Sequence, residues 1–148
     1  MGITAEAERT VELPRERAFE LFIDYSRWHE WMPRDFRPVS GPDRPLVQGD
    51  RLKVRIPPIT AHLKVLRVRP GEEICWGGGV PGLRAEHSFY FEDAGPGRTR
   101  IRSVEPWTGA LTKVGPLAAR LKKEAERIGA AQLDGFLELA RARATATA

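Results

Sequence analysis

The sequence contains one cysteine, Cys75, and no long run of apolar residues. A single cysteine excludes an intrachain disulfide, which favours a cytoplasmic setting. No apolar stretch approaches the roughly 20 residues that cross a bilayer, so we expect no stable membrane insertion. The first ten residues lack the apolar segment of a secretory signal and contain Glu6 and Glu8, which again predicts a cytoplasmic protein.

Motifs for metal, nucleotide or nucleophilic chemistry are also missing. The three histidines and Cys75 lie on separate segments with no CxxC or HxxxH spacing, so we expect no metal site and no cofactor. The glycines at 77–79 do not have the spacing of a phosphate-binding loop, and no serine stands in a GxSxG context.

Basic residues are in slight excess and are dispersed along the chain. The 24 lysines and arginines oppose 20 aspartates and glutamates, which gives a formal charge of +4. The closest groups, Arg51 to Arg55 and Arg98 to Arg102, alternate with other residues as the solvent face of a strand does. We therefore expect solvated charges and no nucleic-acid partner. A basic module that binds nucleic acid or another protein is kept as one functional alternative.

Length and patterning predict one α+β domain. The 148 residues are 41% hydrophobic and 30% charged, a balance typical of a single globular core. Apolar and polar residues alternate over seven candidate strands, at residues 3–13, 36–40, 51–56, 59–68, 73–77, 83–92 and 98–107. Two short helices follow Pro14 and Ser26, and helical spacing predicts a long helix over residues 116–142. We expect a single domain over residues 1–143 and a frayed tail over 144–148.

The order of these elements and several local motifs resemble a known superfamily. The local matches are Val11 to Phe19 (VELPRERAF), Asp24 to Trp31 (DYSRWHEW), His87 to Glu92 (HSFYFE) and Glu105 to Gly109 (EPWTG). Together they resemble the START-like, or SRPBCC, superfamily, which includes polyketide cyclase/dehydrase-like proteins and birch pollen allergen-type proteins. The resemblance implies a helix-grip fold, in which a curved antiparallel sheet wraps a long C-terminal helix and leaves a cavity for an apolar or amphipathic small molecule. It implies no single reaction, because the superfamily has none.

Strand parity selects the residues that face the expected interior. His87 and Phe89 share the apolar face of one strand, and Ser103, Glu105 and Trp107 share that of the next. A five-residue hairpin loop after residue 93 would place His87 directly opposite Glu105. A register two residues different would place Ser103 there instead, with Glu105 on the diagonal.

An imidazole beside a carboxylate forms a competent acid–base pair. The carboxylate favours the imidazolium, whereas apolar walls oppose charging either group. Such a pair could support enolisation or dehydration of a carbonyl substrate, so His87 and Glu105 are candidate catalytic residues. We favour the simpler interpretation that they satisfy each other, or a buried water, within a binding pocket. Arg9, on the inward parity of the first strand, is a second candidate partner for Glu105.

Aromatic side chains supply the expected walls of the pocket, since they are large and stack on planar ligands. The predicted ligand-binding set is Trp28, Trp31, Trp76, Phe89, Ser103, Trp107 and Arg9. We predict that the protein binds a hydrophobic or aromatic small molecule, lipid- or polyketide-like, as a carrier or sensor, and acts as a monomer or homodimer. The alternative is a metal-free polyketide cyclase or dehydratase that uses His87 and Glu105.

Overall fold

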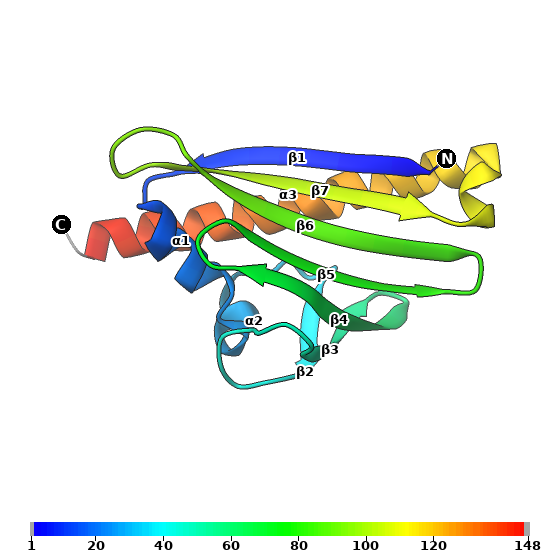
Figure 1. Ribbon diagram of the computed structural model, residues 1–148, viewed down its shortest axis with the longest axis horizontal. Helices are drawn as coiled ribbons and strands as arrows, with labels where there is room; N and C mark the ends of the chain where they lie inside the picture. The colour runs from blue at the N-terminus through cyan, green and yellow to red at the C-terminus, as the bar shows by residue number, and fades with distance from the viewer. Residues whose placement is uncertain (1, 147–148) are drawn as a thin grey trace.

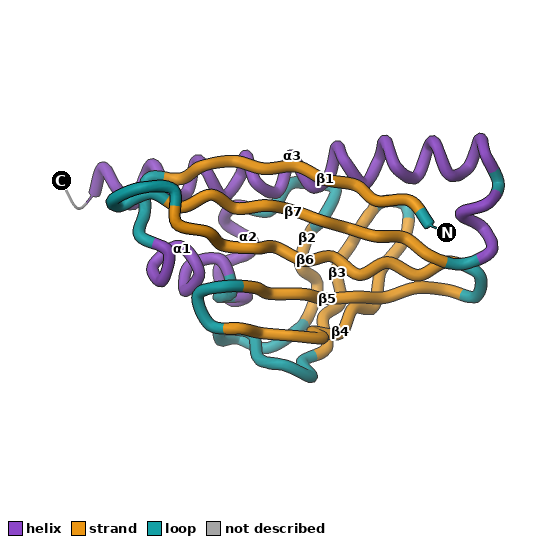
Figure 2. The backbone as a smooth tube through the Cα atoms, turned by 45° about the horizontal axis from the view of Figure 1, so that its top comes forward, coloured by secondary structure: helices purple, strands orange, loops and turns teal. Residues whose placement is uncertain are grey.

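Seven antiparallel strands form one curved sheet, and the long helix α3 (Gly115–Ala146) runs along it (Figures 1 and 2). The strands are β1 (Ile3–Val11), β2 (Arg37–Ser40), β3 (Arg51–Ile56), β4 (Ile59–Arg69), β5 (Glu73–Val80), β6 (Leu83–Asp93) and β7 (Thr99–Thr108). Their order across the sheet is β1-β7-β6-β5-β4-β3-β2, so the first and last strands of the chain pair with each other. The computed structural model describes residues 2–146, with side chains through residue 143. This is the α+β helix-grip architecture predicted from the sequence.

Short helices lie between β1 and β2 and cover one end of the sheet (Figure 1). They are α1 (Arg15–Phe22), the 3₁₀ turn η1 (Tyr25–Arg27) and α2 (Trp28–Trp31); a second 3₁₀ turn, η2 (Ala110–Lys113), precedes α3. Pro14 precedes α1 and its carbonyl accepts the first helical hydrogen bond, from Ala18 N–H at 2.9 Å. Asp24 caps η1 by accepting the backbone N–H of Ser26 at 3.2 Å. Helix α2 follows directly, with Arg27 at its N-cap position and no side-chain capping hydrogen bond.

Helix α3 buries one stripe of side chains against the sheet. Ala125, Leu133, Phe136 and Ala140 are all buried, at spacings that return to one helix face. The helix continues to Ala146, four residues beyond the predicted end. Residues 147 and 148 lie outside the described residues, so the frayed tail and the single-domain division at 143 stay predictions.

Two glycines allow α3 to approach its neighbours closely. A Cβ atom on Gly129 would stand 3.0 Å from Ser103 Oγ on β7. A Cβ atom on Gly135 would overlap the backbone carbonyl oxygen of Trp31 at the end of α2. The absence of side chains at these two positions therefore sets the distance between α3 and the rest of the fold.

Aromatic rings fill the space between the helices and the inner face of the sheet, the face on which α3 lies. Phe22 packs against Phe89 and Phe136, with ring centroids 4.7 and 5.1 Å apart. Trp28 packs against Trp76 at 5.1 Å, and both side chains are almost fully buried. Burying one such side chain contributes about 1.5–3 kcal/mol, so these rings form the main stabilising cluster.

None of the helices in residues 2–146 combines the length and the apolar composition needed to cross a membrane.

Candidate functional site

The polar residues of the candidate site come together at the β6–β7 hairpin. Asp93 pairs with Thr99 and Ala85 pairs with Trp107, which is the register expected from a five-residue loop. This register brings His87 and Glu105 to neighbouring positions on the inner face. His87 Nδ1 lies 3.4 Å from Glu105 Oε2. The other ring nitrogen, Nε2, lies 2.6 Å from Ser103 Oγ, so the imidazole contacts both of the partners that the sequence offered as alternatives.

Burial opposes charge on both members of the pair. It lowers the pKa of His87 from 6.5 to about 3. It raises the pKa of Glu105 from 4.5 to about 7, and the indole of Trp107 acts weakly in the opposite direction. Near neutral pH the imidazole is therefore uncharged, while Glu105 populates both its protonated and ionised forms. The sequence suggested two opposing effects on these pKa values: the attraction between the carboxylate and the imidazolium, and the desolvation of each group. Desolvation is the larger effect.

The 3.4 Å contact between Nδ1 and Oε2 links the protonation state of Glu105 to the tautomer of His87. When Glu105 is ionised it accepts Nδ1–H, and Nε2 is left to accept the hydroxyl proton of Ser103. When Glu105 is protonated it donates to Nδ1, and Nε2–H donates to Ser103 Oγ. The two arrangements differ by one proton, which Glu105 gains or loses, and the imidazole stays uncharged in both.

The aromatic residues of the predicted set surround this pair. Phe89 stacks on the His87 ring with centroids 4.3 Å apart, and Trp76 meets the same ring edge-on at 5.5 Å. Trp28 lies behind Trp76, and its indole N–H donates to the carbonyl of Phe22 at 2.8 Å. These contacts hold the imidazole in a fixed, apolar surrounding.

The indole nitrogens of Trp31 and Trp107 are buried without a hydrogen bond that meets normal geometry. The Nε1 atom of each indole is buried and has no hydrogen-bond partner among the described residues. Trp107 itself is only half-buried and lies near the end of β7. The Trp31 donor is therefore free to bind another group, whereas the Trp107 indole interacts with the Glu105 carboxyl and lowers its pKa.

Gln132 is an interior polar residue that does not belong to the set predicted from the sequence. It is fully buried, and neither Nε2 nor Oε1 has a hydrogen-bond partner within the part of the chain that the structure describes. It lies one turn of α3 beyond Gly129, which faces Ser103, and one turn before Phe136, which packs on Trp31 at 5.1 Å. A polar residue in the middle of the small and apolar stripe of α3 is the signal that would have identified it.

Arg9 contacts a different acid from the one that parity suggested. Its Nε atom lies 2.8 Å from Asp134 Oδ1 on α3, and both side chains are more than one-third exposed. This ion pair joins β1 to α3 at the edge of the sheet. Glu105 is therefore met by His87 and not by Arg9.

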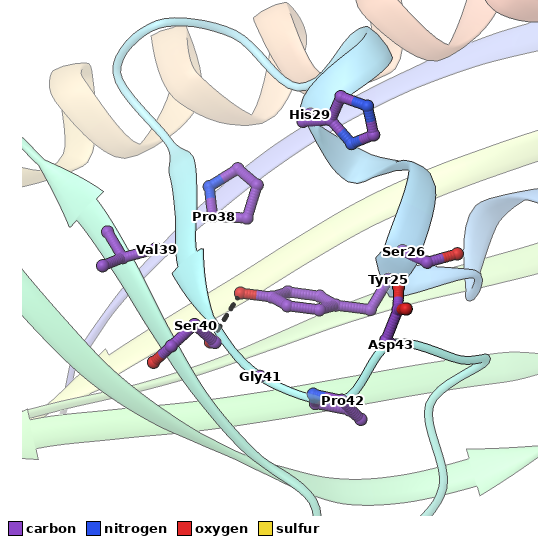
Figure 3. Close-up of a pocket in the computed structure, with 9 residues that line it drawn as sticks. All are labelled: Tyr25, Ser26, His29, Pro38, Val39, Ser40, Gly41, Pro42 and Asp43. Atoms are coloured by element: carbon purple, nitrogen blue, oxygen red, sulfur yellow. Dashed lines mark hydrogen bonds between the residues drawn. The ribbon is translucent and has the colours of Figure 1, made fainter.

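A hollow of about 240 Å³ lies between η1, α2 and β2 (Figure 3). Its lining residues are Tyr25, Ser26, His29 and residues 38–43. The Tyr25 hydroxyl donates to the carbonyl of Ser40 at 2.9 Å, and the Tyr25 ring packs on Trp28 at 4.8 Å. A second hollow, of about 350 Å³, lies over β1 and β7, where Glu6, Glu8 and Arg102 contribute to it. Neither hollow is lined by His87 or Glu105, and no residue of the predicted set except Ser103 lines one of them.

The described residues contain no group of three or more histidine, cysteine, aspartate or glutamate side chains that could hold a metal ion. The polar set of His87, Ser103, Glu105 and Gln132 offers groups for hydrogen bonding and proton transfer.

Comparison with known proteins matches residues 2–145 to the family described as "Polyketide cyclase / dehydrase and lipid transport". The chain belongs to this family. The membership agrees with the superfamily resemblance read from residues 11–31 and 87–109, and with the START-like fold. No curated protein sequence gives a significant match.

Several solved structures share the fold of this family member. The Zhui aromatase/cyclase from Streptomyces sp. R1128 is 19% identical, with a TM-score of 0.68 over 97% of this chain and 96% of that one. A START superfamily protein from Mycobacterium smegmatis is 18% identical, with a TM-score of 0.67 over 92% and 97%. Protein MLL2253 from Mesorhizobium loti is 17% identical, with a TM-score of 0.71 over 93% and 96%. At these identities the likeness concerns the fold alone.

Proposed function

We propose that the protein binds a hydrophobic or aromatic small molecule between α3 and the inner face of the sheet, as a carrier or sensor, and that a polar group of the ligand meets Gln132. The observation that carries the proposal is the fully buried Gln132 amide, whose donor and acceptor atoms both lack partners among the described residues. Leaving a buried polar group unpaired costs about 1–3 kcal/mol, so such a group needs an explanation outside the packed chain. A ligand hydroxyl or carbonyl would pair with it.

The surroundings of Gln132 support an aromatic or amphipathic ligand. Phe136 lies one turn of α3 from Gln132 and packs against Trp31. The indole N–H of Trp31 is a second donor without a partner among the described residues. Phe136 also packs on Phe22, and Phe22 packs on Phe89, so the ring cluster adjoins this turn of α3. Pockets that combine apolar walls with a few convergent polar groups are typical of small-molecule sites. The family description and the aromatase/cyclase name of one structural neighbour support the same class of ligand.

Entry of a ligand requires the packed rings to separate. A chain of ring contacts leads inward from the hollow at Tyr25: Tyr25 touches Trp28, Trp28 touches Trp76, and Trp76 touches His87. We place the entrance at this hollow, where the edge strand β2 is held by the Tyr25 hydroxyl. Movement of a short edge strand disturbs fewer contacts than movement of α3.

The role of Gln132 is tested with two probes that differ by one hydroxyl group, 1-naphthol and naphthalene. We expect Gln132→Leu to weaken the binding of 1-naphthol roughly 5- to 50-fold, because the hydroxyl loses its partner. Naphthalene binding should stay the same or become tighter. Gln48→Leu is the matched control, since Gln48 is exposed. Equal effects of Gln132→Leu on the two probes, or no binding of either probe to the unmodified protein, would contradict the proposal.

Native mass spectrometry of protein purified under mild conditions supplies a second measurement. We expect a retained small molecule in the unmodified protein and a smaller bound fraction in Gln132→Leu. A mass equal to that of the bare chain, together with no probe binding, would count against a ligand carrier.

The cyclase or dehydratase alternative is favoured by one specific feature, the Glu105 carboxyl with a pKa of about 7 beside His87 Nδ1. A general acid or base works best when its pKa is near the working pH. The test is incorporation of solvent deuterium next to the carbonyl of a β-keto thioester. If Glu105 transfers the proton, Glu105→Gln lowers the rate about 10²- to 10⁴-fold; an unchanged rate rules the alternative out.

A further inference from the structure

The outer face of β2, β3 and β4, opposite the face that α3 covers, carries basic side chains and no acidic ones. Residues 51–71 contain no aspartate or glutamate, and β2 contains none either. Leu52, Val54 and Val65 of these strands are buried on the inner face, so the alternate positions point outward. We call the outward set the basic face; it consists of Arg37, Arg51, Lys53, Arg55, His62 and Lys64.

The cations of the basic face differ from most others of the chain in having no acidic partner. Among the side chains of residues 2–143, no carboxylate lies within ion-pair distance of Arg37, Arg51, Lys53, Arg55 or Lys64. Arg55 donates to the hydroxyl of Thr60 at 3.2 Å.

A second alternating basic group of the sequence provides the contrast. On β7 and the turn before it, Arg98 pairs with Glu12, Arg100 with Glu8 and Arg102 with Glu92. Two groups that look alike in the sequence thus differ in the structure. Of these two groups, the basic face is the one whose arginines and lysines have no carboxylate within ion-pair distance among residues 2–143.

The register of the strands brings the unpaired charges together. Arg51 stands directly opposite Lys64, and Arg37 stands directly opposite Arg55. Like charges at such positions repel and destabilise a sheet. The positions paired across the sheet from Arg51 and Lys64 continue through Gly77 on β5 to Glu86 on β6. Glu86 is the first acid in this row, and its carboxylate lies 4.0 Å from Arg67. No carboxylate of residues 2–143 lies within ion-pair distance of these cations, so an external anion is the natural counterpart of the basic face.

Exposed apolar residues adjoin the basic face at one end of the sheet. The β3–β4 turn contains Pro57 and Pro58 and leads into Ile59, which is 58% exposed. The β5–β6 turn lies at the same end and carries Val80, which is 64% exposed (Figure 1). A single exposed apolar residue is ordinary on a protein surface. Here two apolar hairpin ends lie beside unpaired cations, so the same region of the surface is both apolar and basic.

We propose that the basic face and these two hairpin ends bind the protein reversibly to an anionic lipid bilayer. Basic side chains are attracted to anionic headgroups, and short apolar turns insert at the headgroup boundary. A nucleic acid fits less well, because β2, β3 and β4 contain no phenylalanine, tyrosine or tryptophan on which a base could stack. Binding of this kind is peripheral and requires no membrane-spanning segment.

The experiment is co-sedimentation with vesicles of phosphatidylcholine alone and of phosphatidylcholine with 30% phosphatidylserine. We expect binding to the second vesicle only, and a marked loss of binding when salt is raised from ~0.1 to ~1 M. The variant Arg51→Gln/Lys53→Gln/Lys64→Gln should bind on the order of a hundredfold more weakly, because each basic residue contributes separately to the attraction.

The matched control is Arg98→Gln/Arg100→Gln/Arg102→Gln, which removes the same charge from another part of the sheet. We expect it to retain most of the binding. Equal losses in the two triple variants would show that only net charge matters and would overturn the proposal. So would a lack of binding to the anionic vesicles, or tighter binding to a DNA oligonucleotide than to the vesicles.

Folding of the basic-face variant is checked by thermal unfolding. Its melting temperature should equal or exceed that of the unmodified protein, because like-charge neighbours have been removed. A separate variant, Ile59→Ser, keeps every charge; it should weaken vesicle binding while preserving the salt dependence. Unchanged vesicle binding by Ile59→Ser would contradict the part assigned to the hairpin end.

Discussion

His87 and Glu105 have opposite pKa shifts because the same burial acts on a base and on an acid. The folded state holds the Glu105 proton more tightly than the unfolded chain, since the pKa rises from 4.5 to about 7. The stability from Glu105 is therefore complete below pH 4.5 and is lost as the pH rises towards 7, by on the order of 3 kcal/mol. The folded state holds the His87 proton less tightly, so its contribution is complete above pH 6.5 and is lost as the pH falls towards 3. Between pH 4.5 and 6.5 the contribution of Glu105 to stability falls with rising pH while that of His87 rises, so the two oppose each other.

This opposition predicts the effect of Glu105→Gln on the pH dependence of stability. The free energy of unfolding of the unmodified protein should vary little between pH 4.5 and 6.5 and fall between pH 6.5 and 7.5. In Glu105→Gln only the His87 slope remains, so stability should rise from pH 4.5 to 6.5 and then stay level. Urea unfolding at four pH values measures both profiles. Glu6→Gln, at an exposed position of the same sheet, is the control, and a Glu105→Gln profile parallel to that of the unmodified protein would contradict the pKa assignment.

At the scale of elements, the strands and the inward positions of His87, Ser103 and Glu105 follow from the sequence, because a sheet fixes side-chain positions with period two. The sequence left two hairpin registers open, and the structure has the one with a five-residue loop, in which His87 lies beside Glu105. The faces of α3 and of the charged strands do not follow from the sequence. The burial of Gln132 depends on how α3 is rotated about its axis over the sheet, which the close contact at Gly129 sets. The difference between the arginines at 98–102 and the cations at 51–55 depends on acids supplied by distant segments, such as Glu8 and Glu12. Local patterns contain no information of that kind.

The packing of α3 against α2 predicts an unusual result for a glycine replacement. Gly→Ala within a helix normally stabilises it by up to about 1 kcal/mol. At Gly135 the added Cβ atom would overlap the Trp31 carbonyl oxygen, so α3 must move and the ring contacts of Trp31 must open. We expect Gly135→Ala to destabilise the protein by about 1–3 kcal/mol in thermal or urea unfolding. Gly115→Ala, at the start of α3 with no neighbouring atom within 4 Å, is the control and should be neutral. A Gly135→Ala protein as stable as the control would show that α3 and α2 are not in this contact.

At the scale of the whole molecule, the two proposed activities lie on opposite faces of one sheet. Gln132 and the ring cluster face inward, whereas Arg51, Lys53 and Lys64 face outward. The sheet between them is held by backbone pairing that neither set of substitutions touches. Energetic effects at sites with no shared contacts usually add, so each activity should survive loss of the other.

This separation predicts a double dissociation. Gln132→Leu should lose affinity for 1-naphthol and keep its binding to phosphatidylserine vesicles, while the triple basic-face variant should show the reverse pattern. Both variants are measured in both assays, with thermal unfolding to confirm that each is folded. If instead either variant loses both activities while remaining folded, the sites are coupled through the sheet. The hollow at Tyr25 would then be the place to seek the coupling, because β2 contributes Arg37 to the basic face and Ser40 to the wall of that hollow.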